Sequence, residues 1–138
     1  MSERLDRTAA HPIHAVFLAG TMPLFLGALL GDHAYRLSEQ VQWANFAQWL
    51  LAGGLVFATI PLLAALIALF RRGRGARALV YFFVLLSMWV LGFVDSLVHA
   101  RDAWAVMPNG PVLSAIVFVL CLAAIWIGFA RPRAGGAP

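Results

Sequence analysis

Charged residues are scarce in this chain of 138 residues, and lysine is missing altogether. Charged side chains make up 12% of the sequence, against about 25% in a typical soluble domain. Hydrophobic residues make up 62%, more apolar surface than a soluble domain of this length could bury. The composition therefore excludes an ordinary soluble fold and indicates an integral membrane protein.

The sequence also lacks the motifs of familiar active sites. Its one cysteine, Cys121, lies within an apolar run, so no disulfide can form within the chain. There is no cysteine pair, no paired-histidine zinc spacing and no glycine-rich phosphate loop. These absences favour a protein that is not an enzyme.

Four apolar segments reach the length of about 20 residues that a helix needs to cross the hydrocarbon core of a membrane. They run approximately over residues 12–31, 43–70, 76–100 and 111–130. Because the connections are short and the runs do not alternate as barrel strands do, we expect an all-α, up-down-up-down four-helix bundle over residues 11–130. Residues 1–10 and 131–138 are expected to be tails, the second of them disordered.

The arginines predict the orientation of this bundle. Eight of the ten lie in the tails and in one loop, all on the same side of the predicted bundle: Arg4, Arg7, Arg71, Arg72, Arg74, Arg77, Arg131 and Arg133. Two acidic residues accompany them, which gives that side a net charge of +6 against −2 on the other. By the positive-inside rule, both termini are expected in the cytoplasm, with the protein in a bacterial inner membrane. The same distribution argues against nucleic acid as a partner.

Ionisable residues gather at the predicted outer face. The first and third spans end there, which brings Asp32 and His33 to the membrane level of Asp95 and His99. Asp95 and His99 are four residues apart and share one helix face. Since ionisable groups within membrane helices are candidates for function, this polar cluster is the predicted site.

Three interpretations of the cluster remain open. Two imidazoles, His33 and His99, could ligate haem b, or a transition metal together with Asp32 and Asp95. Imidazoles beside carboxylates could instead relay protons along a proton or small-solute pathway. The third interpretation is structural, with side chains that cap helix ends and pair with one another. A further ambiguity concerns Gly27 and Gly31, which could serve helix packing within one chain or between chains of a homo-oligomer.

Two short motifs carry a resemblance to a known family. His11-Pro12-Ile13-His14 opens the first span, and His99-Ala100-Arg101-Asp102-Ala103-Trp104 is followed by Met107-Pro108 and by Leu113-Ser114 in the fourth. In these residues, and over about Ala10 to Phe129, the chain resembles the bacterial membrane proteins of domain of unknown function 2231 (DUF2231). The resemblance implies a four-helix membrane domain with the signature positions His11, His14, His99, Arg101, Asp102 and Trp104. It implies no reaction.

The leading hypothesis from the sequence is that the protein is a non-catalytic accessory or structural subunit of a membrane assembly. A respiratory or redox complex is one such assembly. Its partners would be the lipid bilayer and other membrane proteins or further copies of the chain. The alternatives are an electron carrier that binds haem b or a metal through His33 and His99, and a proton or small-solute pathway.

Overall fold

The computed structural model describes residues 12–72, 75–101 and 106–130. These residues form four long helices, α1 (Pro12–Ser38), α2 (Val41–Arg72), α3 (Ala76–His99) and α5 (Asn109–Phe129). Each helix lies on one of the four apolar segments, and the described ranges contain no β-strand. The prediction of an all-α bundle is confirmed. The predicted tails, residues 1–10 and 131–138, lie outside the described residues.

The first helix is longer than its apolar segment. It continues seven residues past Gly31, because Asp32 and Tyr35 are buried against the other helices and hold the extra turns in place. Glu39 then takes the left-handed backbone conformation, with φ at 56°, and its N–H donates to the carbonyl of Tyr35 at 2.7 Å. This arrangement is a common way for a helix to end.

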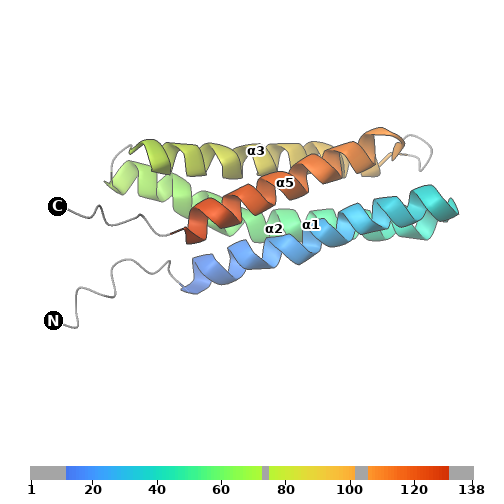
Figure 1. Cartoon of the computed structure of the whole chain (residues 1–138), viewed down its shortest axis with the longest axis horizontal. Helices are drawn as coiled ribbons and strands as arrows, with labels where there is room; N and C mark the ends of the chain where they lie inside the picture. The colour runs from blue at the N-terminus through green and yellow to red at the C-terminus, as the bar shows by residue number, and fades with distance from the viewer. Residues whose placement is uncertain (1–11, 73–74, 102–105, 131–138) are drawn as a thin grey trace, which may run out of the picture.

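The helices are arranged in a ring in which each packs against its neighbours along the chain and α5 returns to α1 (Figure 1). The start of α1 and the end of α5 lie at the same end of the bundle, which we call the tail end. The opposite end, where α1 and α3 finish and α2 and α5 begin, is called the cluster end.

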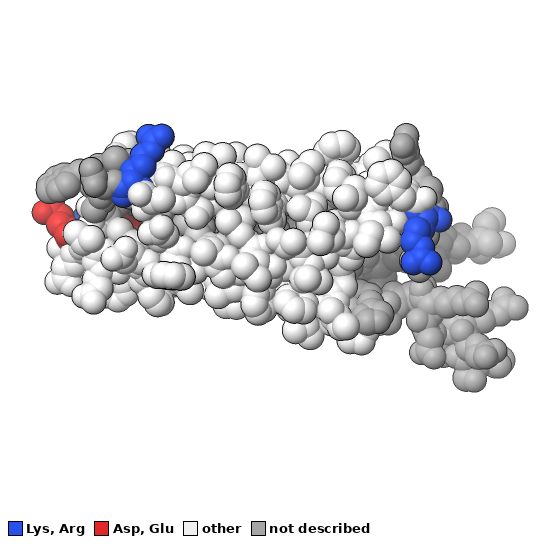
Figure 2. Space-filling view, turned by 180° about the vertical axis from the view of Figure 1, so that it is seen from behind, with Lys and Arg blue, Asp and Glu red and all other residues white. Residues whose placement is uncertain are grey.

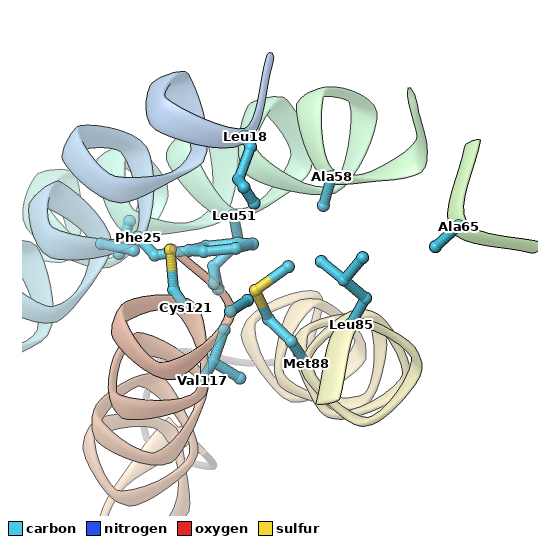
Figure 3. Packing of buried hydrophobic residues seen from close by; sticks show 12 residues of the cluster. Leu18, Phe25, Leu51, Ala58, Ala65, Leu85, Met88, Val117 and Cys121 are labelled. Atoms are coloured by element: carbon cyan, nitrogen blue, oxygen red, sulfur yellow. The ribbon is translucent and has the colours of Figure 1, made fainter. Parts of the chain in front are cut away.

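A continuous apolar core fills the centre of the bundle. Side chains from all four helices point toward one another there (Figure 3). The largest fully buried members are Leu18, Phe25, Leu51, Leu85, Met88 and Val117. Cys121 is one of the buried residues and donates to or accepts from Thr21 Oγ1 at 3.2 Å.

The outer surface of the bundle is apolar as well. Figure 2 shows one face on which the charged side chains lie at the two ends and the long middle has none. Large aromatic side chains project from this surface, including Trp49, Phe70 and Trp126, which are 77%, 79% and 78% exposed. All four helices are long and apolar enough to cross a membrane. An apolar surface of this kind is suited to lipid rather than to water.

Glycines bring α1 and α2 into close contact. A Cβ atom added to Gly31 would lie 3.2 Å from both the Trp43 carbonyl oxygen and Ala47 Cβ, and one added to Gly27 would lie 2.7 Å from Leu50. These two glycines therefore face α2 of the same chain. Packing within the chain accounts for their spacing.

Gly31→Ala is expected to destabilise the bundle, because the new methyl group would meet backbone that cannot move aside independently of α2. Overpacking of this kind costs about 1–3 kcal/mol. Gly53→Ala is the matched control, since a Cβ there would lie 3.8 Å from the flexible side chain of Leu24, an ordinary contact. Thermal unfolding of both variants in detergent measures the difference. Equal midpoints for the two variants would contradict the close-contact interpretation.

Candidate functional site

Four polar side chains from three helices meet inside the cluster end of the bundle. Asp32 comes from α1, Asp95 and His99 from α3, and Ser114 from α5. Asp32 and Asp95 are 0% exposed, Ser114 is 1% and His99 is 5%. We call these four residues the polar cluster.

Helix periodicity explains why these side chains face inward. On α3 the buried positions are Leu85, Met88, Gly92, Asp95 and His99, which recur every three or four residues along one face. Ser114 similarly continues the buried stripe of Val117 and Cys121 on α5. The polar cluster is therefore the last layer of the core. Asp95 lies four residues from the end of α3, which corresponds to a depth of about 6 Å.

His99 is held by hydrogen bonds at both ring nitrogens. Its Nε2 lies 2.6 Å from Asp32 Oδ1, and its Nδ1 lies 2.9 Å from the backbone carbonyl oxygen of Asp95. The Asp95 carboxylate is also near, with Oδ1 3.2 Å from Nδ1. No ring nitrogen of His99 is left free for another ligand.

Ser114 joins the two carboxyl groups to each other. Its Oγ lies 2.6 Å from Asp32 Oδ2 and 2.8 Å from Asp95 Oδ2. Among the described residues, the one buried side-chain N or O atom without a hydrogen-bond partner is Asp95 Oδ1. The polar cluster is thus a closed network with a single unsatisfied acceptor.

The beginning of α5 covers the imidazole of His99. A Cβ atom added to Gly110 would lie 3.0 Å from His99 Cε1 and 3.4 Å from His99 Nε2. Val106, just before this helix, is fully buried and lies against Gly110 as well. A glycine is therefore needed where the helix backbone lies against the imidazole ring.

The structure does not bring the sequence-predicted pair of His33 and His99 together. The side chain of His33 is exposed, whereas that of His99 is buried. Neighbouring residues on a helix point about 100° apart, so the rotation of α1 that directs Asp32 inward turns His33 away. The imidazole of His99 therefore meets a carboxylate from α1 where a second imidazole was expected.

The predicted metal ligands are only partly assembled. Asp32, Asp95 and His99 converge, but His33 does not join them. Within residues 12–72, 75–101 and 106–130, no group of three His, Cys, Asp or Glu side chains is arranged to hold a metal ion. The nitrogen and oxygen atoms that face one another in the polar cluster form hydrogen bonds within it instead.

The two other signature positions that the structure describes, His14 and Arg101, do not join the polar cluster. His14 is at the tail end, where its Nε2 is 2.8 Å from the hydroxyl oxygen of Tyr81 on α3. Arg101 follows α3 and is exposed. His11, Asp102 and Trp104 lie outside the described residues.

Neither Ser114 nor Tyr81 stands out in the sequence as a candidate site residue. Ser114 is the only hydroxyl-bearing residue in the predicted fourth span, and an isolated hydroxyl in an apolar run was a usable signal. Tyr81 is one of two tyrosines in the chain, but nothing in its spacing links it to His14, which lies 67 positions earlier. That contact depends on how α1 and α3 pack.

Comparison with known families agrees with the fold. The family model described as "Predicted membrane protein (DUF2231)" matches residues 10–131 of the chain, which include all four helices. The chain belongs to this family. No curated protein matches the chain, and no solved structure does. With its four apolar helices, this DUF2231 member is a multi-pass membrane protein.

Ser114→Ala is expected to destabilise the protein, because it leaves two buried carboxyl groups without their shared partner. An unsatisfied buried polar group costs about 1–3 kcal/mol. Ser96→Ala is the matched control, since Ser96 is half-buried, lies next to Asp95, and has no side-chain hydrogen bond to the described residues. Thermal unfolding in detergent compares the two. A Ser114→Ala midpoint equal to that of Ser96→Ala would show that the network contributes nothing to stability.

Proposed function

We propose that this DUF2231 protein is a non-catalytic accessory subunit of a membrane assembly, in which the polar cluster fastens three helices together. The observation that carries the proposal is the closure of the cluster. Both ring nitrogens of His99 and both oxygens of Asp32 are bonded within the protein, and all four side chains are buried. A catalytic centre or an electron carrier needs a position open to substrate or cofactor.

The composition of the core disfavours a pathway across the membrane. The other buried polar side chain on α1 is Thr21, which lies 11 residues, or about 16 Å, from Asp32 along the helix. Between their levels the core consists of apolar side chains such as Phe25, Met88 and Val117. A proton relay would ordinarily need ionisable groups or water through this region.

The apolar outer surface supports a role among membrane partners. Trp49 and Trp126 are each more than three-quarters exposed, on α2 and α5 respectively. Tryptophan side chains suit both the lipid interface and helix contacts between proteins. We propose that lipids cover most of this surface and that a partner membrane protein or a second copy of the chain covers the remainder.

The absorption spectrum of purified protein, oxidised and then reduced, tests this function together with a metal analysis. We expect a colourless, metal-free protein that migrates on native gels as part of a larger assembly when extracted from its own membranes. A haem band or stoichiometric metal would overturn the accessory role and favour the carrier that uses His33 and His99.

Two histidine variants separate these alternatives further. His99→Ala is expected to lower stability by about 3–5 kcal/mol, because it leaves the buried Asp32 carboxylate unpaired. His33→Ala is the control and should leave stability unchanged, since its side chain is exposed. In a bis-histidine carrier, both variants would lose the same absorption band.

We also propose that both termini are cytoplasmic, with the polar cluster at the outer face of a bacterial inner membrane. The support is the excess of arginine in the tails and the loop between α2 and α3. A topology reporter fused after Arg133 is expected to be active only in the cytoplasm. A periplasmic signal would contradict this orientation.

A further inference from the structure

We propose that the polar cluster is a proton-binding site in which Asp95 holds a proton as a neutral carboxylic acid and releases it to water at the cluster end when the pH rises. The inference goes beyond the accessory role. It rests on counting the hydrogen atoms that the contacts in the cluster require.

The first hydrogen is fixed by a backbone carbonyl. His99 Nδ1 lies 2.9 Å from the Asp95 carbonyl oxygen, and a carbonyl oxygen can only accept. Nδ1 must therefore carry a hydrogen. At 2.6 Å, the contact between His99 Nε2 and Asp32 Oδ1 needs a second hydrogen. Whether that hydrogen resides on nitrogen or oxygen, the Asp32 and His99 pair has a net charge of zero.

The next two hydrogens lie around Ser114. Its Oγ is within hydrogen-bond distance of two carboxyl oxygens, 2.6 Å from Asp32 Oδ2 and 2.8 Å from Asp95 Oδ2. A hydroxyl group has a single hydrogen, so it satisfies one of these contacts. The other contact needs a hydrogen on a carboxyl group, which then donates to Oγ.

The total is four hydrogens, of which neutral histidine and serine supply one each. The remaining two are titratable protons, and with them the Asp32, Asp95 and His99 group is electrically neutral. Without the second proton, the cluster would hold a net negative charge. Low-dielectric surroundings penalise a buried net charge heavily, so neutrality agrees with the position of the cluster inside a membrane bundle.

Asp95, rather than Asp32, carries the carboxyl proton. Both oxygens of Asp32 face a group that can donate, Nε2 of His99 and Oγ of Ser114, as suits a carboxylate. Asp95 Oδ1 is buried and has no hydrogen-bond partner among the described residues, because the Nδ1–H of His99, although Nδ1 is only 3.2 Å away, donates to the Asp95 carbonyl oxygen. A buried carboxylate oxygen without a donor costs more free energy than the carbonyl oxygen of a neutral carboxylic acid in the same position. The hydrogen bonds therefore run from Asp95 to Ser114 and from Ser114 to Asp32.

No other helix brings a compensating charge to this level. Residues 41–70 of α2 contain no ionisable side chain, and the only one on α5 is the distant Cys121. On α1, His33 and Arg36 are exposed and Tyr35 is buried beside the cluster end. When Asp95 loses its proton to water, the negative charge on its carboxylate is not compensated, because His99 is already paired with Asp32. Raising the pH should thus weaken the cluster end of the bundle.

Two isosteric variants test the assignment. Asn in place of Asp95 can donate from its amide to Ser114, as the neutral acid does, so Asp95→Asn should unfold at or above the temperature of the unsubstituted protein. Asn in place of Asp32 presents an N–H to either His99 Nε2 or Ser114 Oγ, both of which need an acceptor there. Asp32→Asn should therefore unfold at a clearly lower temperature. The unfolding temperature of the unsubstituted protein should fall toward alkaline pH, and Asp95→Asn should abolish that fall.

Infrared spectra of protein labelled with ¹³C in the aspartate carboxyl groups give a readout that does not depend on unfolding temperatures. The chain has four aspartates, and exposed ones are ionised at neutral pH. We expect one neutral carboxylic acid band at neutral pH, lost on alkalinisation and missing from Asp95→Asn. The absence of this band at neutral pH would overturn the proposal. Loss of the band in Asp32→Asn, with retention in Asp95→Asn, would overturn the assignment to Asp95.

Discussion

Carboxyl groups are costly to bury in an apolar bundle, and this cost determines how the helices of this protein pack. Asp32 and Asp95 are both fully buried, where an uncompensated negative charge is strongly unfavourable. Compensation comes from His99 and Ser114, so α1, α3 and α5 must each contribute a side chain. The three helices can satisfy this requirement in one rotational setting, and the polar cluster thereby selects a single packing from the many that apolar side chains alone would allow.

The contact between α1 and α2 agrees with that setting. Gly31 lies against the backbone of α2, and the next residue, Asp32, points into the core. One rotation of α1 therefore serves both the close contact with α2 and the hydrogen bond to His99. The same rotation leaves His33 on the surface. When neighbouring residues all favour the same orientation of a helix, their contacts together favour a unique fold.

The two ends of the bundle use polar residues differently. At the tail end, Arg77 donates from Nη2 to the carbonyl oxygens of Ile127 and Ala130 and so satisfies two of the carbonyls left free where α5 ends. His14 and Tyr81 are only half-buried there. At the cluster end, His33 and Arg36 are exposed but the four residues of the polar cluster are buried, so a change of charge within the cluster acts directly on helix packing. Water can therefore hydrate a charge at the tail end more readily than a charge within the polar cluster.

Three features could be predicted from the sequence: the membrane class, the four helices, and the level at which Asp32, Asp95 and His99 meet. These follow from the length of each apolar run and from the antiparallel order of the helices, which are properties of single segments. Helix packing, in contrast, determines that Asp32 rather than His33 faces His99, that Ser114 joins the two carboxyl groups, and that Tyr81 contacts His14. Each of these depends on the rotation of one helix against another, and a step of one residue, about 100°, exchanges the inward side chain. Composition and hydropathy do not fix that rotation, because an apolar helix face is equally suited to lipid and to the core; the packing of Gly31 on α2 and the pairing of buried charges do.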